Sequence, residues 1–528
     1  MAVLQLIQDK GETALALAIA HPIPALSTAA VLVFLLLRLT ILSPKARLRA
    51  QLAQLPVLNG DASVDEKRKA FLQTAHQLYQ AGYQKFKDEA YRMPTSDDVE
   101  NVVIPPKFMR DLRTLSDSDL NFYPAAAKIL ESKYTGVLTD LSAVAHSVRA
   151  ELTPALARLN PLVVDEVESA FKVEMPECSD WTPVPIYMTI ANMVAKITGR
   201  VFVGEGLCRS PEYLDNAINY AVDVSAAQVE VKQMNPLLRP FLAPRLASVR
   251  RLRLREASAA RFFEPLVQAR LDAEKRGEQA PDDMLSVLMR KSEGRGIVTA
   301  AEMAQIQLGI IFAAVHTTSE SMTHIMYDLA VRPEYIGPLR EEIREVLASH
   351  GGEMNSHALQ QMFKLDSFMK ESLRLSPPLT TTFHRVVGKR GLTLPQGTRV
   401  PTGATIELAS RAIMRDNEHY GQDGVDAAEF DGLRHYRRRT RPDAGATDHA
   451  RHQFVASHEQ SLFFGYGRHA CPGRFFAAQE MKMLLVRLIL DYDFKNADGS
   501  KERYPNIEIG PLIVPDEHKN LLFKRVKN

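Results

Sequence analysis

The stretch Leu462–Ala478, LFFGYGRHACPGRFFAA, decides how this 528-residue chain is interpreted. Gly465 and Gly467 precede Cys471, and Pro472 with an amphipathic run follows it. Glycines permit tight turns and the close approach of a flat ligand. Since Pro472 suits the first position of a helix, we expect Cys471 at a helix amino terminus, where the dipole favours a thiolate. A thiolate is the ligand that a soft metal site prefers.

Other roles for Cys471 fit the sequence less well. A lone cysteine is most often a small buried hydrophobe. A zinc site needs further Cys or His ligands, and the chain has no CxxC pair. His469, two residues away on a tight loop, is poorly placed as the base of a cysteine nucleophile. The two remaining cysteines, Cys178 and Cys208, are too few for a disulfide framework in a chain of this length.

A long helix is predicted upstream of this loop. Thr299–Glu302 has the pattern of a capping box, and helical text continues to Val331, where Pro333 ends it. About 30 residues at 1.5 Å each span roughly 45 Å, enough to cross a domain. Its middle, Leu308–Val315, is apolar on every side, so we expect it to be buried all round.

Four polar residues, His316–Ser319, follow that apolar segment directly. Polar side chains inside a buried helix need partners. Two interpretations are open. The hydroxyls bond back to carbonyls one turn earlier, or the segment is a polar notch that faces a ligand or cofactor.

The rest of the body predicts a fold that is mainly α with small β-sheets. Apolar residues recur at helical spacing in three long segments, 70–90, 148–173 and 257–273. Leu392–Val400 predicts a β-hairpin, and the polar, Arg- and His-rich stretch Asp431–Ser457 predicts an irregular loop. A formal net charge of +2 argues against a nucleic-acid partner.

The amino end differs from the body. Between Glu12 and Arg38 the titratable side chain is His21, and an apolar block suits a membrane span from about Pro24 to Leu42. A cleaved secretory signal and a buried core helix are the alternatives. Basic residues after the span predict that the body is cytoplasmic.

Four segments together resemble the cytochrome P-450 family in order and spacing. The Cys471 loop resembles its haem-binding loop, and the long helix resembles its oxygen-activating helix. Within the family, the sequence is similar to membrane-bound fungal members of the ent-kaurene-oxidase-like group. The resemblance rests on Ala313–Thr318, on Glu371-x-x-Arg374, on Phe430–Arg434 and on Phe464-x-x-Gly467-x-His469-x-Cys471-x-Gly473.

The resemblance implies haem b as cofactor, with Cys471 as the axial ligand of its iron. Thr317, with His316 beside it, is then expected to manage protons at the oxygen-binding face. A buried network is implied for Glu371, Arg374 and Arg434. The resemblance also places four residues around the haem, namely Arg385 and His469 at a propionate and Phe464 and Gly473 in the binding loop.

This chain departs from the family pattern at three places. His469 stands where the family commonly has Arg, and His316 stands where it commonly has Asp or Glu. The Trp-x-x-x-Arg of an early helix is missing because the single tryptophan is Trp181, and neither His146 nor Arg149 is assigned in its place.

The resemblance implies a single-pass protein of the endoplasmic reticulum membrane. Residues 1–43 are the expected anchor, 44–60 a linker and 61–528 the catalytic domain on the cytoplasmic side. The expected activity is monooxygenation of an apolar specialised metabolite of terpenoid or polyketide type, with NADPH electrons from a cytochrome reductase. A haem-thiolate isomerase or dehydratase, or a non-catalytic haem-binding protein, is the alternative.

Two surfaces are expected to serve these partners. The substrate pocket is expected along Leu308–Val315, Leu379–Phe383 and Pro511–Val514. The basic residues Arg437, Arg438, Arg439 and Arg441 dock the reductase or belong to a solvated loop.

Overall fold

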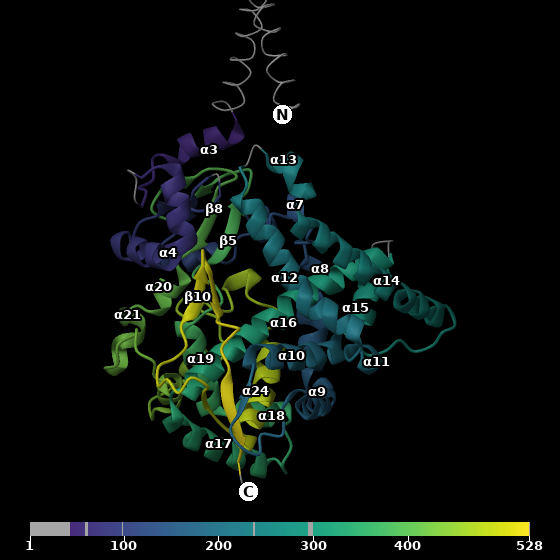
Figure 1. Ribbon diagram of the computed structural model, residues 1–528. Coiled ribbons are helices and arrows are strands. Elements are labelled where there is room, and N and C mark those ends of the chain that lie inside the picture. Colours follow the sequence, from purple (N-terminus) through teal and green to yellow (C-terminus); the bar gives the residue numbers. More distant parts are fainter. Residues whose placement is uncertain (1–42, 59–61, 98, 236–237, 294–298, 527–528) are drawn as a thin grey trace, which may run out of the picture.

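The computed structural model describes residues 43–58, 62–97, 99–235, 238–293 and 299–526 (Figure 1). Nearly all of the expected anchor, residues 1–43, lies outside these described residues, so the anchor stays a prediction. Within the described part of the chain, no helix is long and apolar enough to span a bilayer.

Helices dominate the fold, as the sequence predicts. The long central helix α16 (Ala300–Ala330) begins at the expected capping box, in which Thr299 accepts from the Glu302 amide. The three periodic segments are helical, although the first helix ends at Lys85 because the chain then turns into a strand. The other α-helices, with the π-helix η2, are α3 (Pro44–Leu52), α4 (Val64–Lys85), α5 (Met109–Leu112), α6 (Phe122–Ile129), α7 (Ser132–Thr135), α8 (Ser142–Ser147), η2 (Val148–Leu152), α9 (Thr153–Glu174), α10 (Ile186–Phe202), α11 (Glu205–Cys208), α12 (Pro211–Gln233), α13 (Arg239–Leu242), α14 (Ala247–Lys275), α15 (Met284–Glu293), α17 (Ile336–Ser349), α18 (Ser356–Gln361), α19 (Phe363–Leu375), α20 (Ser410–Met414), α21 (Asn417–Tyr420), α22 (Arg434–Thr440), α23 (Ala446–Arg451) and α24 (Arg474–Asp491).

Small sheets complete the fold. A five-stranded sheet has the order β1-β2-β8-β5-β3, in which β2 and β8 are parallel and the other pairs are antiparallel. The predicted hairpin is present as β6 and β7. The strands are β1 (Tyr91–Met93), β2 (Asn101–Val103), β3 (Leu120–Asn121), β4 (Thr182–Val184), β5 (Thr382–Val387), β6 (Leu392–Thr393), β7 (Arg399–Val400), β8 (Thr405–Leu408), β9 (Tyr492–Asn496), β10 (Asn506–Ile509), β11 (Leu512–Pro515) and β12 (Leu521–Arg525).

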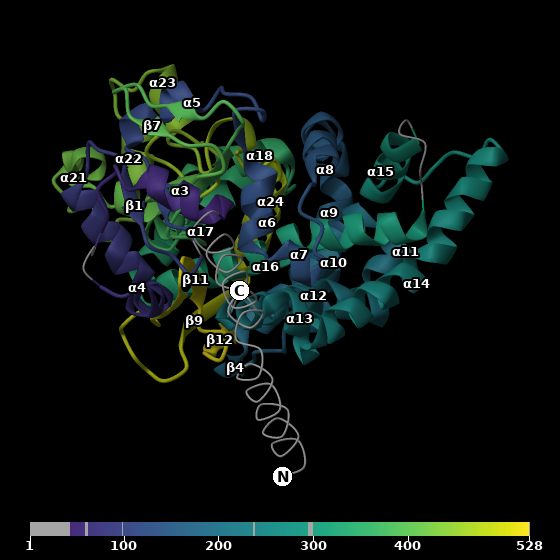
Figure 2. The ribbon, with the colours of Figure 1, turned by 90° about the horizontal axis from the view of Figure 1, so that it is seen from above.

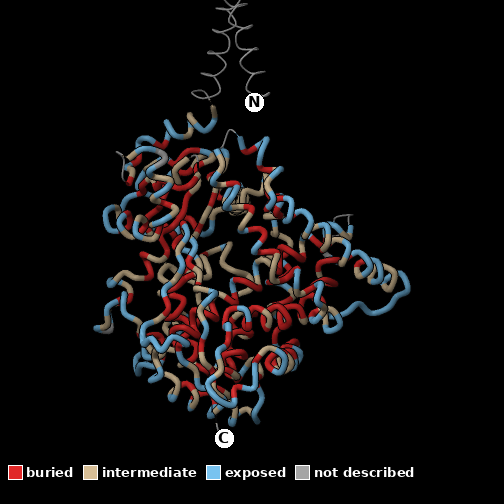
Figure 3. Tube along the Cα trace, in the orientation of Figure 1, coloured by how far each residue is buried: buried red, intermediate tan, exposed pale blue. Residues whose placement is uncertain are grey.

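Two hydrophobic cores lie side by side. The larger one joins α9, α10, α12, α14, α16, α19 and α24, and the smaller one fills the sheet-rich part around α4 and β8. Seen from above, α16 runs between the helical part and the sheet-rich part (Figure 2). Buried chain is concentrated along this middle region (Figure 3). The central helix is therefore in a position to contribute to a site between the two parts.

The prediction of an irregular loop over Asp431–Ser457 is wrong, because the helices α22 and α23 lie within it. Both are short and lack apolar periodicity, so the sequence pattern that marks a helix is absent. The segment 44–60, predicted as a linker, begins with helix α3. Ser43 caps this helix by accepting from the Ala46 amide.

Candidate active site

The Cys471 loop is held by local backbone geometry. Gly465 and Gly467 both have positive φ angles, of 72° and 71°, which favour glycine. A Cβ on Gly467 would lie 2.8 Å from Cβ of Arg113, so this turn also needs glycine for space. The Cys471 amide donates to the Phe464 carbonyl at 2.8 Å and closes the loop.

Cys471 precedes helix α24 by three residues. The helix begins at Arg474 with Gly473 as N-cap, so Pro472 lies in the preceding turn and not at the first helical position as expected. Burial raises the pKa of the Cys471 thiol, whereas amide hydrogen bonds from Gly473 and Arg474 lower it. The amides therefore stabilise a thiolate once a cation binds the sulfur.

Helix α16 is not buried all round, in contrast to the expectation. Ala313 and Thr317 are exposed, one turn apart, although most of their neighbours on the helix are buried. The Thr317 hydroxyl donates to the Ala313 carbonyl at 2.7 Å, and Ser319 bonds back to Val315 in the same way. Both interpretations of this segment therefore apply. The hydroxyls bond back to carbonyls one turn earlier, and Thr317 nevertheless lies on an accessible face of the helix.

His316 points into the helix packing. Its Nε2 lies 2.6 Å from the Ile218 carbonyl, and its Nδ1 lies 2.8 Å from the Tyr187 hydroxyl. A carbonyl can only accept, so Nε2 carries the proton and Nδ1 accepts from Tyr187. Burial lowers the pKa of His316, which favours this neutral form. Both nitrogens are engaged in joining α16 to α10 and α12.

Glu371, Arg374 and Arg434 come together in a buried network. Arg374 holds Glu371 with two hydrogen bonds of 2.7 Å, and Arg434 Nε donates to the same carboxylate at 3.2 Å. The remaining guanidinium donors reach backbone carbonyls, among them Met414 for Arg374 and Tyr420 for Arg434. All three side chains are at most 1% exposed.

The same helix, α19, also fixes the chain that leads to the Cys471 loop. Lys370 donates to the Gln453 carbonyl at 2.8 Å and to the Ser461 hydroxyl at 3.0 Å. Asp366 accepts from the Phe454 amide at 2.7 Å. Burial lowers the pKa of Lys370 to about 7. Polar groups of α19 therefore tie residues 453–461 down directly before the loop begins.

Cationic side chains gather on one side of the loop. Arg385 is 5% exposed, and its Nη1 donates to the His384 carbonyl at 2.7 Å. Among the described residues it forms no ion pair, and burial lowers its pKa to about 10. Arg474 Nε is buried without a partner. Burial lowers the pKa of Arg474, and the positive charge of Arg149 lowers it further. A buried guanidinium without a carboxylate is well suited to an anionic ligand.

His469 lies within this group. Its Nε2 is 2.7 Å from Asp117 Oδ1, and its ring stacks on Phe122 with centroids 5.4 Å apart. Burial lowers its pKa in spite of Asp117. Asp117 can only accept, so Nε2 carries the proton and Nδ1 of the neutral ring can only accept, which does not suit the expected bond to a propionate.

Comparisons with known proteins show the family. The family model described as Cytochrome P450 matches residues 74–522. The chain belongs to the cytochrome P450 family. It is 37% identical over 437 residues to a cytochrome P450 monooxygenase of Stachybotrys chlorohalonatus, covering 82% of this chain and 90% of the relative.

Further relatives are also fungal enzymes. A cytochrome P450 monooxygenase of Emericella nidulans is 34% identical and covers 86% of this chain and 84% of the relative. The ent-kaurene oxidase of Gibberella intermedia is 32% identical and covers 84% of this chain and 82% of the relative. The chain is thus a P450 monooxygenase, and its family implies a haem-thiolate cofactor.

The residues of this P450 fit a haem. Cys471 supplies a thiol with amide donors, the buried Arg385 and the half-buried Arg474 supply positive charge for propionates, and Gly473 has no atom within 4 Å of a built Cβ. Arg149, which the sequence left unassigned, lies close enough to Arg474 and Tyr123 to influence their pKa values. It joins the cationic side, although no sequence motif indicated this.

Replacing Arg385 by leucine should weaken haem retention. A hydrogen bond to a charged group contributes about 1.5–3 kcal/mol, so haem affinity should fall by roughly 10- to 100-fold. Haem content after gel filtration and dilution measures this. Arg390→Leu is the matched control because Arg390 is 81% exposed. Equal haem retention in both variants would contradict the assignment of Arg385.

The three segments expected at the substrate pocket are neighbours. Leu379 forms a bridge with Leu512, the Thr380 amide donates to the Pro511 carbonyl at 2.8 Å, and β11 packs on α16. Leu379 and Leu512 are 36% and 38% exposed. Within Leu308–Val315, however, most side chains are core residues, and Ala313 is the exposed one.

The four arginines of the expected docking surface differ from one another. They lie on or just after α22, not in a loop. Arg439 is buried, with its guanidinium 3.9 Å from the centre of the Phe363 ring. Arg437 pairs with Asp431 and Arg441 with Asp448. Neither expectation, docking surface or solvated loop, therefore holds for Arg439.

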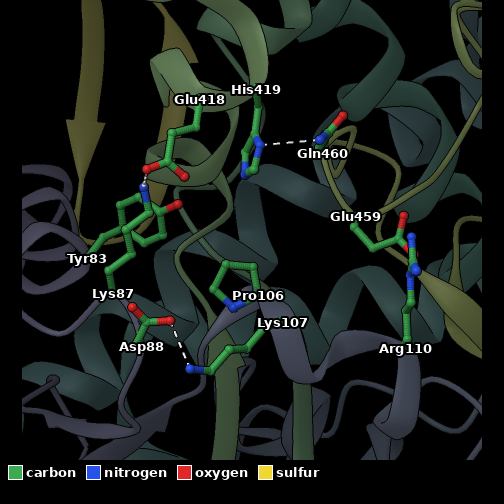
Figure 4. A pocket seen from close by; sticks show the side chains of 10 residues that line it. All are labelled: Tyr83, Lys87, Asp88, Pro106, Lys107, Arg110, Glu418, His419, Glu459 and Gln460. Atoms are coloured by element: carbon green, nitrogen blue, oxygen red, sulfur yellow. Dashed lines mark hydrogen bonds and ion pairs between the residues drawn. The ribbon is translucent and has the colours of Figure 1, made fainter.

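A surface pocket of about 420 Å³ lies between α4, α5 and α21 (Figure 4), and its Glu459 accepts from the Tyr466 hydroxyl of the Cys471 loop at 2.9 Å. Its basic residues face acids within the pocket. Lys87 pairs with Glu418 at 2.7 Å, Lys107 with Asp88 at 2.8 Å and Arg110 with Glu459 at 2.9 Å. These pairs already neutralise the basic groups, so we assign the reaction to the Cys471 side.

Proposed function

We propose that this P450 is anchored in the endoplasmic reticulum membrane and inserts one oxygen atom into an apolar specialised metabolite of terpenoid or polyketide type. Its electrons come from NADPH through a separate cytochrome reductase. The observation that carries the reaction class is Cys471, set in a glycine-turned loop with amide hydrogen bonds to its thiol.

The substrate class is supported by the fungal relatives and by the walls near α16. One relative is named an ent-kaurene oxidase. The exposed leucines Leu379 and Leu512 and the exposed Ala313 offer apolar contact and few hydrogen bonds. Such walls bind a hydrocarbon skeleton by burial of apolar area and discriminate weakly between similar skeletons.

When bound, haem with a thiolate ligand supplies the chemistry that cleaves dioxygen. The chain itself does four things. Cys471 would hold the iron, with its thiolate stabilised by the Gly473 and Arg474 amides. Arg385 and Arg474 would bind the propionates, Thr317 places a hydroxyl on the accessible face of α16, and the Glu371 network keeps the surrounding chain in place.

Co-expression with a fungal NADPH-cytochrome reductase tests the proposal. Membranes are incubated with candidate terpenoid and polyketide precursors under ¹⁸O-labelled dioxygen, and products are examined by mass spectrometry. We expect a product heavier by one labelled oxygen atom that requires NADPH. A product of unchanged mass, formed without reductase, would instead establish the isomerase alternative.

A further inference from the structure

Glu320 is an acidic residue on the accessible face of α16. Ala313, Thr317 and Glu320 follow one another at steps of four and three residues, which places them on one side of the helix. Ala313 and Thr317 are exposed and Glu320 is half-buried, whereas Ser319 and Ser321 on either side of it are buried. The open face that carries Thr317 therefore extends to a carboxyl group one turn further along.

The Glu320 carboxyl has no partner that would give it a structural role. Among the described residues it forms no hydrogen bond and no ion pair. The groups that face it are Glu517, which follows β11, and Tyr187 on α10. Burial raises the pKa of Glu320 to about 8, and the nearby charge of Glu517 raises it further in the same direction. At neutral pH the carboxyl therefore holds a proton.

Glu517 connects this interior acid to solvent. Its side chain is 53% exposed. Its charge affects the pKa values of Glu320, Tyr187 and His316, so it lies within electrostatic range of all three. Glu320 thus lies on the face of α16 that carries the accessible Thr317 and within electrostatic range of the solvent-exposed Glu517.

His316 is not placed to donate a proton to Thr317, because both of its ring nitrogens are already hydrogen-bonded. Its Nε2 is bonded to the Ile218 carbonyl and its Nδ1 to Tyr187, and burial keeps it neutral. The Thr317 hydroxyl differs, because it donates to the Ala313 carbonyl and keeps its lone pairs free to accept. A protonated carboxyl three residues away, directly or through one water, is a suitable donor to it.

We propose that Glu320 relays protons from solvent at Glu517 to Thr317 during the oxidation. The proposal rests on the monooxygenase function. The overall reaction consumes dioxygen, NADPH and one proton, and it yields hydroxylated product, water and NADP⁺. Electrons come from the reductase. Once the Thr317 hydroxyl turns away from the Ala313 carbonyl, the Glu320 carboxyl gives its proton to the Thr317 oxygen as the Thr317 O–H proton leaves on the open face of α16, and water at Glu517 then reprotonates Glu320.

The first test does not depend on turnover. Holoprotein is titrated from pH 6 to 10 while the infrared C=O stretch of protonated carboxyls is recorded. Burial also raises the pKa of Glu480 to about 8 and of Glu407 to about 7, so the spectrum of Glu320→Gln is subtracted from that of the parent at each pH to remove their bands. We expect the difference spectrum to show a band that disappears with a midpoint near pH 8. Glu341→Gln, at an exposed position of α17, is the matched control, and its difference from the parent should lack this band. A parent-minus-Glu320→Gln difference without the band would overturn the assignment of the proton to Glu320.

The second test follows where the electrons of NADPH go. With reductase, NADPH and dioxygen alone, hydrogen peroxide is measured against NADPH consumed. The water-forming fraction is the share of NADPH whose electrons reduce dioxygen to water and not to hydrogen peroxide. In Glu320→Gln we expect this fraction to fall by at least roughly tenfold. The fall is smaller than the 10²- to 10⁴-fold effect of a directly acting acid because water partly replaces the carboxyl. In the parent protein this fraction should decline as pH rises through about 8, since deprotonated Glu320 cannot donate.

The pH profile separates a relay from a structural effect. Glu320→Gln should lose the decline near pH 8 while its thermal midpoint stays unchanged, because glutamine keeps the shape and no bond is lost. An unchanged partition of electrons in Glu320→Gln would overturn the relay. The reduced, CO-bound spectrum is recorded for each sample. Absence of the thiolate band in the parent protein would contradict the proposed function itself. A normal band, together with the parent's division of electrons between water and hydrogen peroxide in Glu320→Gln, would contradict the relay alone.

Discussion

Cys471→Ala should abolish the red-shifted Soret band that a thiolate-ligated haem gives in the reduced, CO-bound state. The reason is that no other described cysteine is placed to replace it. Cys178 and Cys208 are buried in the helical core, and burial raises the pKa of Cys208 to about 11. NADPH-dependent product formation should fall to background, a larger effect than the roughly 10- to 100-fold cost of losing an outer-shell partner of a metal ligand.

Cys208→Ala serves as the control for this experiment. Cys208 is fully buried on α11 and its thiol donates to the Glu205 carbonyl, so its loss affects packing and not the haem. Its CO-bound band should keep its position. A red-shifted band that persists in Cys471→Ala would overturn the ligand assignment.

Glu371→Gln should prevent the accumulation of folded holoprotein at growth temperature. Glutamine removes the charge that neutralises two guanidinium groups, each at most 1% exposed. Breaking a buried ion pair by removing one partner typically costs about 3–5 kcal/mol. This is a large part of the about 5–15 kcal/mol by which a domain is stable. Holoprotein yield and the midpoint of urea unfolding measure the loss.

Two further variants make this result specific. Glu341→Gln on the exposed side of α17 should unfold at the parent's urea concentration. Arg374→Lys keeps the charge but loses the two parallel bonds to Glu371. Its urea midpoint should therefore lie between those of the parent and Glu371→Gln. A Glu371→Gln protein as stable as the parent would show that the network does not brace the fold.

The sequence predicted those features whose causes are local. The capping box of Thr299 and Glu302 marks the start of α16 because both partners lie within one turn. The hairpin of β6 and β7 follows from its own turn residues. The Cys471 loop is recognisable because its glycines meet backbone requirements of the loop itself, namely positive φ at Gly465 and Gly467.

The Glu371 network was predicted as well, but only because the sequence resembles the cytochrome P-450 family. Glu371 and Arg374 are neighbours on a helix, which is equally typical of an exposed ion pair. Their burial depends on Arg434, on the Ala427 carbonyl and on the Tyr420 ring over Arg374, which reach them from 46 or more residues away along the chain. The pattern therefore named the residues, and the fold decided that they form a core.

Tertiary structure alone decided which polar residues are free to act. His316, Thr317 and Glu320 lie within five residues of one another and all carry polar side chains. Packing against Tyr187 and the Ile218 carbonyl engages both nitrogens of His316, while Thr317 and Glu320 lie on the accessible face. In the same way, burial over Phe363 removes Arg439 from the surface. A residue's neighbours in space set its protonation and exposure, and a linear sequence does not contain them.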